Sequence, residues 1–444
     1  MSQVSQFSLL GQKRFGPYYL TQFLGAFNDN VFKNALLLLI AFQAAERYAM
    51  SSHTLINLSA GLFILPFFLF SATAGQLADK FEKSMLIRGI KLLEITIMSM
   101  AAIAFWLDSV PALIALLFLM GVQSSLFGPV KYGILPQILE EKELLKGNGL
   151  VGMATFMAIL LGTACGGLLI GIPDSGRLLV AAAVLFLAFA GYLASRQMPV
   201  VQALDPDLKI NWNPIPETVR LMAYALSSRL IFISIAGISW FWFLGATYLA
   251  QLPNYTLQYL GGNEEVVTLL LALFSIGIGL GSLLCDRLTG HRICFSLVPV
   301  GMLGVSLFGF DLAMLEPLDG SLELMGAADW FNTVNALRVL LDIVLLGVFG
   351  GFFIVPLYAW VQTRTDPAHR SRVIAANNVL NALLMVFSAS LAIGLLAAGW
   401  TIGELFILVS ILNLSVFIIF CIRAPEILSD FTGWIKSIFY AVIR

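Results

Sequence analysis

Charged side chains are scarce in this sequence. Asp, Glu, Lys and Arg together make up 11% of its 444 residues, and hydrophobic residues make up 59%. The mean hydropathy is +0.90. A soluble protein of this length could not cover its surface with so little charge. The composition therefore predicts a polytopic membrane protein, and the net charge of −1 argues against a nucleic-acid partner.

Metal ligands and nucleophiles are also few. The histidines stand far from any second ligand and the cysteines lie in or at the ends of hydrophobic runs: His53, His291, His369, Cys165, Cys285, Cys294 and Cys421. The sequence contains no phosphate-binding loop of the Walker type. We therefore expect no disulfide framework, no metal, no cofactor, no enzymatic activity and no ATP-driven pumping.

Hydrophobic windows predict twelve membrane spans, at about 17–43, 54–78, 85–107, 110–129, 148–172, 177–196, 230–258, 264–285, 293–315, 333–361, 373–398 and 401–423. No cleavable signal peptide is recognisable, and Lys13 and Arg14 precede the first span. With the N-terminus inside, the Lys and Arg residues fall on the cytoplasmic side except for Lys33, Arg47, Arg177 and Arg338. This asymmetry predicts that both termini are cytoplasmic.

The first predicted span carries a polar stripe near its middle. The stripe belongs to the stretch Gln22-Phe-Leu-Gly25-Ala-Phe-Asn28-Asp29-Asn30-Val-Phe-Lys33-Asn34. At 100° per residue, Gln22, Asp29 and Lys33 share one helical face. An ionisable group at this depth costs several kcal/mol unless it meets a partner or a wet cavity. One interpretation is an Asp29–Lys33 pair that neutralises itself. Because several amides surround the pair, we favour a stripe that faces a polar cavity.

A gap in hydrophobicity, rich in Pro and Asp, separates two halves. We predict an N-terminal six-helix bundle at 1–197, a cytoplasmic linker at 198–229, a C-terminal six-helix bundle at 230–424 and an amphipathic C-terminal helix at 425–444. The halves repeat each other, because Gly75-Gln-Leu-Ala-Asp79-Lys80 follows the second span and Ser282-Leu-Leu-Cys-Asp286-Arg287 follows the eighth. This repetition indicates a parallel duplication.

The two repeated loops resemble the signature of the major facilitator superfamily, Gly-x-Leu-Ala-Asp-Arg-x-Gly-Arg-Arg. Lys80 replaces an arginine in the first copy, and Ser282 replaces the opening glycine in the second. The resemblance implies an all-α membrane protein with two pseudo-symmetric six-helix bundles. In such loops a carboxylate caps a neighbouring helix and pairs with cations. We therefore interpret these loop residues as a conformational latch: Gly75, Asp79, Lys80, Asp286 and Arg287.

Other stretches indicate one family within this superfamily. The chain resembles the bacterial lysophospholipid transporter family in Gln22 to Asn30, Lys131-Tyr132-Gly-Ile-Leu, Asn148-Gly-Leu and Gly350-Gly-Phe-Phe-Ile-Val-Pro356-Leu. The run Trp240-Phe-Trp-Phe-Leu-Gly-Ala-Thr is similar to the transporter portion of fused proteins, in which an acyltransferase and an acyl-carrier-protein ligase follow. The resemblance implies movement of lysophospholipids, such as lysophosphatidylethanolamine, from the outer to the inner leaflet of a bacterial inner membrane for re-acylation. It also implies an acyltransferase/acyl-carrier-protein ligase as partner or fused module.

The seventh span departs from this family. Standalone members carry an arginine there, whereas residues 240–256 contain no cation, and Gln251 and Asn254 are the nearest polar groups. We therefore expect the second half to contact the headgroup differently.

A carrier of lysophospholipids needs a cation for the phosphate and an anion or amides for an ammonium headgroup. Residues of these types predict the substrate site: Gln22, Asp29, Asn30, Lys33, Lys131, Tyr132, Asn148, Asn377, Asn378 and Asn381. Lys131 is either the phosphate ligand or an ordinary positive-inside anchor, and the asparagines are either gate residues or helix caps. In the third span, we expect Lys91 to extend to the interface and Glu94 to pair with Lys91 or Lys33.

Two other functions remain open. One is a proton-linked exporter of amphipathic compounds, in which Asp29 is the proton site. The other is a membrane scaffold that recruits acylation enzymes and transports nothing.

Overall fold

The computed structural model describes residues 6–41, 52–318 and 324–443. Within these residues the secondary structure is helical except for one isolated β-bridge, between Gly262 and Met325. The chain divides into two compact units. Unit 1 comprises Met1–Glu141, Met157–Ser227 and Arg364–Ala382, and unit 2 comprises Lys142–Phe156, Ser228–Thr363 and Leu383–Arg444. Two helices, α6 (Leu144–Ile170) and α14 (Arg370–Ala397), are each shared between the units.

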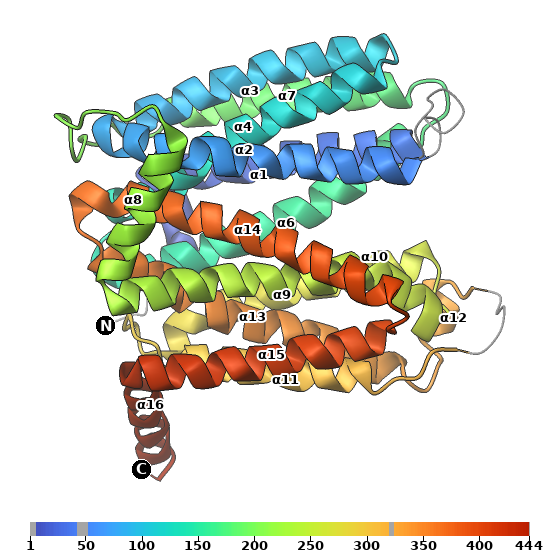
Figure 1. The fold of residues 1–444 in the computed structure, drawn as a ribbon. Helices are drawn as coiled ribbons and strands as arrows, with labels where there is room; N and C mark the ends of the chain where they lie inside the picture. The colour runs from blue at the N-terminus through green and yellow to red at the C-terminus, as the bar shows by residue number, and fades with distance from the viewer. Residues whose placement is uncertain (1–5, 42–51, 319–323, 444) are drawn as a thin grey trace. The chain divides into compact units, whose positions relative to one another are not determined.

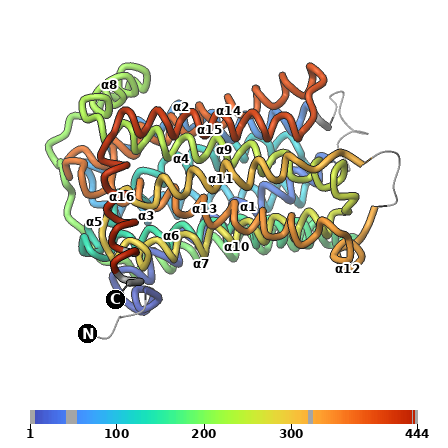
Figure 2. The backbone as a smooth tube through the Cα atoms, turned by 90° about the horizontal axis from the view of Figure 1, so that it is seen from below, coloured from blue at the N-terminus to red at the C-terminus, as the bar shows by residue number. Residues whose placement is uncertain are grey.

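Unit 1 is built on five long helices together with the later part of α6, the first part of α14 and the shorter α8. Their bounds are α1 (Gly16–Leu39), α2 (Ser52–Lys80), α3 (Lys83–Trp106), α4 (Val110–Gly133), α7 (Gly176–Arg196) and α8 (Pro214–Ser227). Helix α2 packs on α4, α3 packs on both α4 and α7, and α1 packs on α7 (Figures 1 and 2). The interior contains the apolar faces of α1, α3, α4 and α7, including Phe32, Met98 and Leu113.

Unit 2 contains the first part of α6 and the later part of α14. Its other helices are α9 (Arg229–Tyr259), α10 (Glu264–Leu288), α11 (Leu297–Ala313), α12 (Ala327–Trp330), α13 (Ala336–Arg364), α15 (Ile402–Arg423) and α16 (Pro425–Ile443). Helix α11 runs beside α15, and α16 contacts both (Figures 1 and 2). Glycine lets α10 and α13 approach closely, because a Cβ on Gly347 would lie 2.5 Å from the carbonyl oxygen of Phe274.

Short helical segments complete the chain: η1 (Gln6–Gly11), α5 (Leu135–Ile138), η3 (Glu141–Glu143) and η4 (Pro367–His369). Helix ends follow local signals. Pro17 lies in the first turn of α1, and the Glu82 side chain accepts the N–H groups of Ser84 and Met85 at the start of α3.

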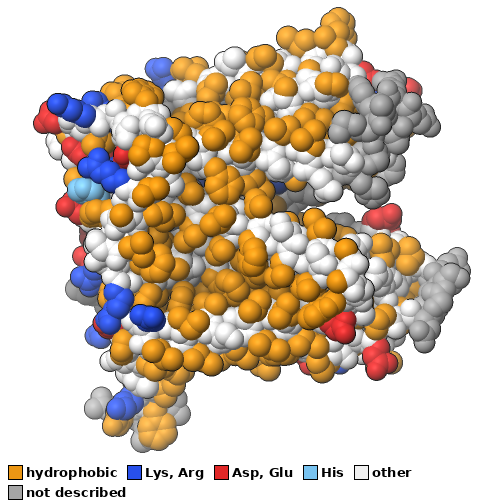
Figure 3. Space-filling model, in the orientation of Figure 1, with side chains coloured by type: hydrophobic (Ala, Val, Ile, Leu, Met, Phe, Trp, Pro, Cys, Tyr) orange, Lys and Arg blue, Asp and Glu red, His pale blue; other side chains and the backbone are white. Residues whose placement is uncertain are grey.

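In the described part of the chain, nine helices are long and apolar enough to cross a membrane: α2, α4, α6, α7, α9, α10, α13, α14 and α15. Helices α1 and α3 have 24 residues each but are more polar: α1 combines two charged residues with several amides, and α3 contains four charged residues. Helix α11 has 17 residues. Hydrophobic side chains cover the helix flanks in Figure 3, while Lys and Arg gather near α8 in unit 1 and near α16 in unit 2. These features confirm the predicted all-α membrane class. The count of twelve spans and the domain bounds stay predictions.

Candidate functional site

The most distinctive polar group in unit 1 joins α1 to α4. Asp29 is half-buried on α1, and its Oδ2 atom accepts a hydrogen bond of 2.9 Å from the Ser124 hydroxyl on α4. Asp29 also interacts electrostatically with Lys33 on its own helix and with Lys131 on α4. Asp29 also interacts electrostatically with Glu94 and Lys91 on α3. The group therefore contains more charges than an isolated Asp29–Lys33 pair. We call Asp29, Lys33, Ser124 and Lys131 the α1–α4 site.

Aromatic rings hold both cations of the α1–α4 site. The Nζ atom of Lys33 lies 5.5 Å from the centroid of Phe63, and that of Lys131 lies 5.2 Å from the centroid of Tyr132. The Tyr18 hydroxyl donates a 2.8 Å hydrogen bond to the backbone carbonyl of Lys131, which ties α4 to α1. A ring face attracts an ammonium group without cancelling its charge. The site can therefore still bind an anionic group such as a phosphate.

A second, fully buried charge cluster lies deeper in unit 1. Lys91 and Glu94 on α3 form an ion pair of 2.6 Å, and their side chains are 1% and 0% exposed. Asn28 and Gln123 donate hydrogen bonds of 3.0 and 3.1 Å to the two Glu94 oxygens. The expectation that Lys91 extends to the interface is wrong, whereas its predicted alternative, pairing with Glu94, is confirmed.

Two glycines make room for Lys91. A Cβ on Gly25 of α1 or on Gly191 of α7 would lie 2.9 Å from the Lys91 Nζ atom. The ammonium group therefore sits where two helix backbones lack side chains. Gly25, which stands within the polar stretch of the first span, serves packing around this cluster.

The other predicted substrate-site residues divide between the units. Those in unit 1 are Gln22 and Asn30 on α1, Tyr132 on α4, and Asn377, Asn378 and Asn381 in the first part of α14. The Asn30 amide donates to the carbonyl of Ala26 on its own helix at 2.7 Å. Asn377 is 1% exposed, and its amide atoms have no hydrogen-bond partner within the described residues.

Asn148 is not part of unit 1. It belongs to the part of α6 in unit 2, where its side chain and that of Gln362 on α13 exchange hydrogen bonds of 2.6 and 3.1 Å. This amide pair joins two helices of unit 2, so Asn148 and the α1–α4 site are in different units.

The first predicted latch loop contacts the start of α14 within unit 1. Asp79, fully buried, accepts the N–H groups of Ser371 at 3.0 Å and Arg372 at 3.2 Å. It also pairs with the Arg372 guanidinium at 3.1 Å, and Asp205 pairs with the same guanidinium at 3.0 Å. Gly75 permits this contact, because a Cβ there would lie 2.9 Å from the Cα of Arg372. The carboxylate therefore stabilises the N-terminus of α14 through both hydrogen bonds and charge.

Lys80 and the second loop are arranged differently. The Lys80 ammonium donates to the carbonyl of Leu208 at 2.7 Å. In unit 2, the Asp286 Oδ2 atom lies 2.7 Å from Nδ1 of His291 and 3.8 Å from Nζ of Lys146, while Arg287 is exposed. Asp286 of the second loop thus pairs with side chains, whereas Asp79 of the first loop also accepts backbone N–H groups.

Sequence reasoning did not select several residues of these sites. Ser124, Gln123, Ser371 and Arg372 each donate to a predicted carboxylate. Ser124 and Gln123 had a usable signal, because together with Ser125 they are the polar residues in the middle of an otherwise apolar span. Ser371 and Arg372 had none, since they are distant in sequence from Asp79.

The fold and these sites define the class of protein: a multi-pass helical membrane protein with buried charge inside its helical bundles. A sequence model of the Major Facilitator Superfamily matches residues 18–328. Lysophospholipid transporter LplT of Escherichia fergusonii is 30% identical over 406 residues, covering 88% of this chain and 92% of the relative. LplT of Escherichia coli strain K12 / DH10B matches to the same extent.

Solved structures show the same fold. The human organic anion transporter MFSD10 (TETRAN) aligns with a TM-score of 0.70 at 16% identity, over 91% of this chain and 98% of that one. The major facilitator superfamily proton:xylose symporter XylE aligns with a TM-score of 0.69 at 13% identity, over 94% and 96%. The chain belongs to the major facilitator superfamily and, within it, to the family of the lysophospholipid transporters. The resemblance to the lysophospholipid transporters is thereby confirmed, and the resemblance to the fused proteins stays a prediction.

Proposed function

We propose that this protein transports lysophospholipids, such as lysophosphatidylethanolamine, from the outer to the inner leaflet of a bacterial inner membrane. The α1–α4 site is the observation that carries the proposal, because it combines two cations with one carboxylate inside a membrane bundle. A lysophosphatidylethanolamine head has one phosphate and one ammonium group. The two lysines suit the phosphate, and Asp29 suits the ammonium group.

The orientation follows from the charge asymmetry of the sequence, with both termini cytoplasmic. The substrate would then be released where re-acylation takes place, and an acyltransferase/acyl-carrier-protein ligase would be the partner or fused module. In this proposal the chain transports and catalyses no reaction. The Asp79 loop acts as a latch that holds the start of α14 during part of the transport cycle.

Uptake of labelled lysophosphatidylethanolamine into spheroplasts tests the proposal. Cells that express the full chain should accumulate and re-acylate the label faster than cells with empty vector. Equal uptake would overturn the proposal and would leave the scaffold as the alternative. Repeating the assay with a collapsed proton gradient tests the other alternative, a proton-linked exporter with Asp29 as its proton site. An unaffected rate would exclude that alternative.

A further inference from the structure

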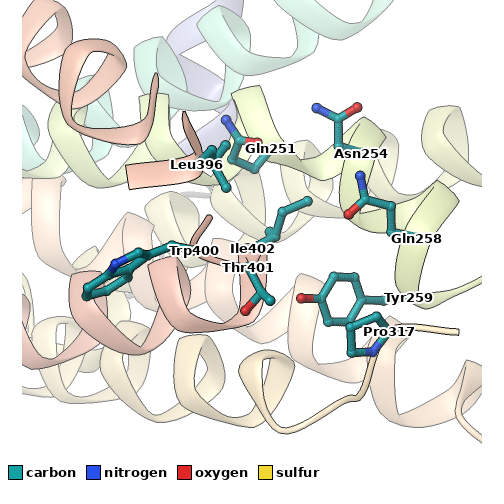
Figure 4. Close-up of a pocket in the computed structure, with 9 residues that line it drawn as sticks. All are labelled: Gln251, Asn254, Gln258, Tyr259, Pro317, Leu396, Trp400, Thr401 and Ile402. Carbon is teal, nitrogen blue, oxygen red and sulfur yellow. The ribbon is translucent and has the colours of Figure 1, made fainter. Parts of the chain in front are cut away.

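Unit 2 contains a pocket whose lining residues are not among the predicted site residues. It has a volume of about 320 Å³ and is lined by Gln251, Asn254, Gln258, Tyr259, Pro317, Leu396, Trp400, Thr401 and Ile402. Figure 4 shows the three amide side chains along α9 on one side and Trp400, Thr401 and Ile402 on the other. In the orientation proposed above, this end of α9 faces the outer leaflet. We call this pocket the amide pocket, after the side chains of Gln251, Asn254 and Gln258.

The amide pocket is polar but uncharged. Asn254 and Gln258 are exposed at its rim, while Gln251 is 9% exposed. The Oε1 atom of Gln251 is buried and has no hydrogen-bond partner within the described residues. An unpaired buried acceptor costs about 1–3 kcal/mol, so a ligand that brings a donor to it is favoured.

Two other polar groups of the pocket already have partners. The Tyr259 hydroxyl accepts the N–H of Gly403 at 2.9 Å, and Thr401 caps α15 by accepting the N–H of Glu404 at 3.2 Å. These contacts fix the wall opposite α9. Together with the indole N–H of Trp400, the amides are therefore the groups that a ligand meets, and they offer both donors and acceptors.

The charge and volume of the pocket limit the class of ligand that it can bind. None of the described lining residues is charged, so these residues offer no cation for a phosphate and no carboxylate for an ammonium group. Its volume lies at the lower end of the range of small-molecule sites, about 300–1,000 Å³, which suits part of a lipid and not a whole one. A neutral hydroxyl on a short carbon skeleton fits, since Leu396, Ile402 and Trp400 can cover the carbons.

Every lysophospholipid carries such a group: the glycerol hydroxyl left free by the missing acyl chain. A diacyl lipid has an ester at this position and cannot donate a hydrogen bond. We propose that the amide pocket binds this free glycerol hydroxyl in the outer leaflet, with Gln251 as acceptor, and so distinguishes lysophospholipids from diacyl lipids. The inference rests on the proposed function and adds to it the group that is recognised.

The test uses the full chain in proteoliposomes and two substrates. One is lysophosphatidylethanolamine, and the other is its 2-deoxy analogue, in which hydrogen replaces the free hydroxyl. A site built to bind a hydroxyl discriminates strongly against an analogue that lacks it. We expect the wild-type protein to transport the lysophospholipid at least about 10-fold more efficiently than the analogue, which corresponds to one hydrogen bond of about 1.4 kcal/mol.

The variant Gln251→Leu should transport both substrates at the low rate of the analogue, so the preference disappears. The matched control is Gln197→Leu, an exposed amide at the end of α7 in unit 1, which should keep the preference. Thermal denaturation of each variant in detergent checks that it is folded. If Gln251→Leu fails to fold, Asn254→Ala at the rim replaces it, and a preference reduced at least about 3-fold is then expected.

Equal transport of the two substrates by the wild-type protein would overturn the inference while supporting the proposed function. A full preference in both pocket variants would also overturn it. If neither substrate moves, the proposed function itself fails.

Discussion

Replacing Lys131 is the most direct test of phosphate binding. Its ammonium group interacts with Asp29 and lies over the Tyr132 ring, on the α4 side of the α1–α4 site. We expect Lys131→Ala to lose one charge-assisted contact of about 1.5–3 kcal/mol, which lowers the apparent affinity for lysophosphatidylethanolamine about 10- to 150-fold. Lys131→Arg should keep much of the activity. Concentration-dependent uptake into proteoliposomes measures both.

The control for this prediction is Lys209→Ala, which removes an exposed lysine between α7 and α8. Normal affinity in Lys131→Ala combined with inactivity in Asp29→Asn would contradict the phosphate role. That result would favour Asp29 as a proton site.

Glu94 illustrates the opposite role, a buried charge that holds the bundle together. It pairs with Lys91 and accepts hydrogen bonds from Asn28 and Gln123. We expect Glu94→Leu to lower the free energy of unfolding by about 3–5 kcal/mol, because Lys91 is left buried and uncompensated. The double variant Lys91→Met/Glu94→Leu should recover much of this loss. Thermal denaturation of the four proteins in one detergent forms the double-mutant cycle, and additive effects would show that the two residues are not coupled.

At the scale of the element, Asp79 fixes the N-terminus of α14. It accepts two backbone N–H groups and pairs with Arg372. We expect Asp79→Ala to lower the free energy of unfolding by about 3–5 kcal/mol, since it removes the cap of α14 and one of the two carboxylates that pair with the buried Arg372 guanidinium. Asp207→Ala, an exposed aspartate of the same linker region as Asp205, should be neutral. Equal thermal midpoints for the two variants would refute a structural role of the Asp79 contact.

The hydrogen bonds of Glu82 at the start of α3 predict how the stability of the fold depends on pH. Burial alone would raise the pKa of Glu82, but hydrogen bonds from the Ser84 hydroxyl and from the N–H groups of Val201, Ser84 and Met85 bring the pKa below its ordinary value. A lowered carboxyl pKa stabilises the fold above the unfolded value of about 4.3, and this stabilisation is lost as the pH falls through the lower folded value. Glu82→Gln should therefore melt below the wild-type protein at about pH 7 and approach it near pH 3. A constant difference across this range would contradict the assignment.

Helices were predictable from sequence to the extent that local signals define them. The first span, predicted at about 17–43, corresponds to α1 (Gly16–Leu39), and the span predicted at about 177–196 corresponds to α7 (Gly176–Arg196). Side-chain partners across the bundle were not predictable. Lys91 lies near a predicted interface in sequence, but glycines on α1 and α7 open the space in which it is buried. Such space depends on which helices are neighbours, and hydrophobic periodicity does not contain that information.

The candidate site shows the same limit. Asp29 and Lys33 were selected because charge inside a span is costly and therefore has a purpose. Lys131 was selected as a cation for the phosphate, beyond the end of the predicted fourth span. Their interaction with one another required the packing of α1 beside α4, as did the role of Ser124. The amide pocket depends on the approach of the α14–α15 connection to α9, so its amides could be noted in sequence but not assembled.

For the whole molecule, the decisive question is where the acyl chain travels. A single tail costs about 0.8 kcal/mol per CH₂ to expose to water, so a carrier that moved it through an aqueous cavity would slow about 4-fold with each added methylene. The polar groups described here match only the head of the substrate, and the flanks of the helices are apolar. We therefore expect the tail to remain against hydrocarbon or apolar side chains while the head alone passes through the protein.

Initial rates for lysophosphatidylethanolamine with C14 and C18 chains, pre-inserted in the outer leaflet of proteoliposomes, should differ by less than about 3-fold. The aqueous route predicts about 200-fold for the same four methylenes, so a fall of that size would show that the tail leaves the hydrocarbon during transport.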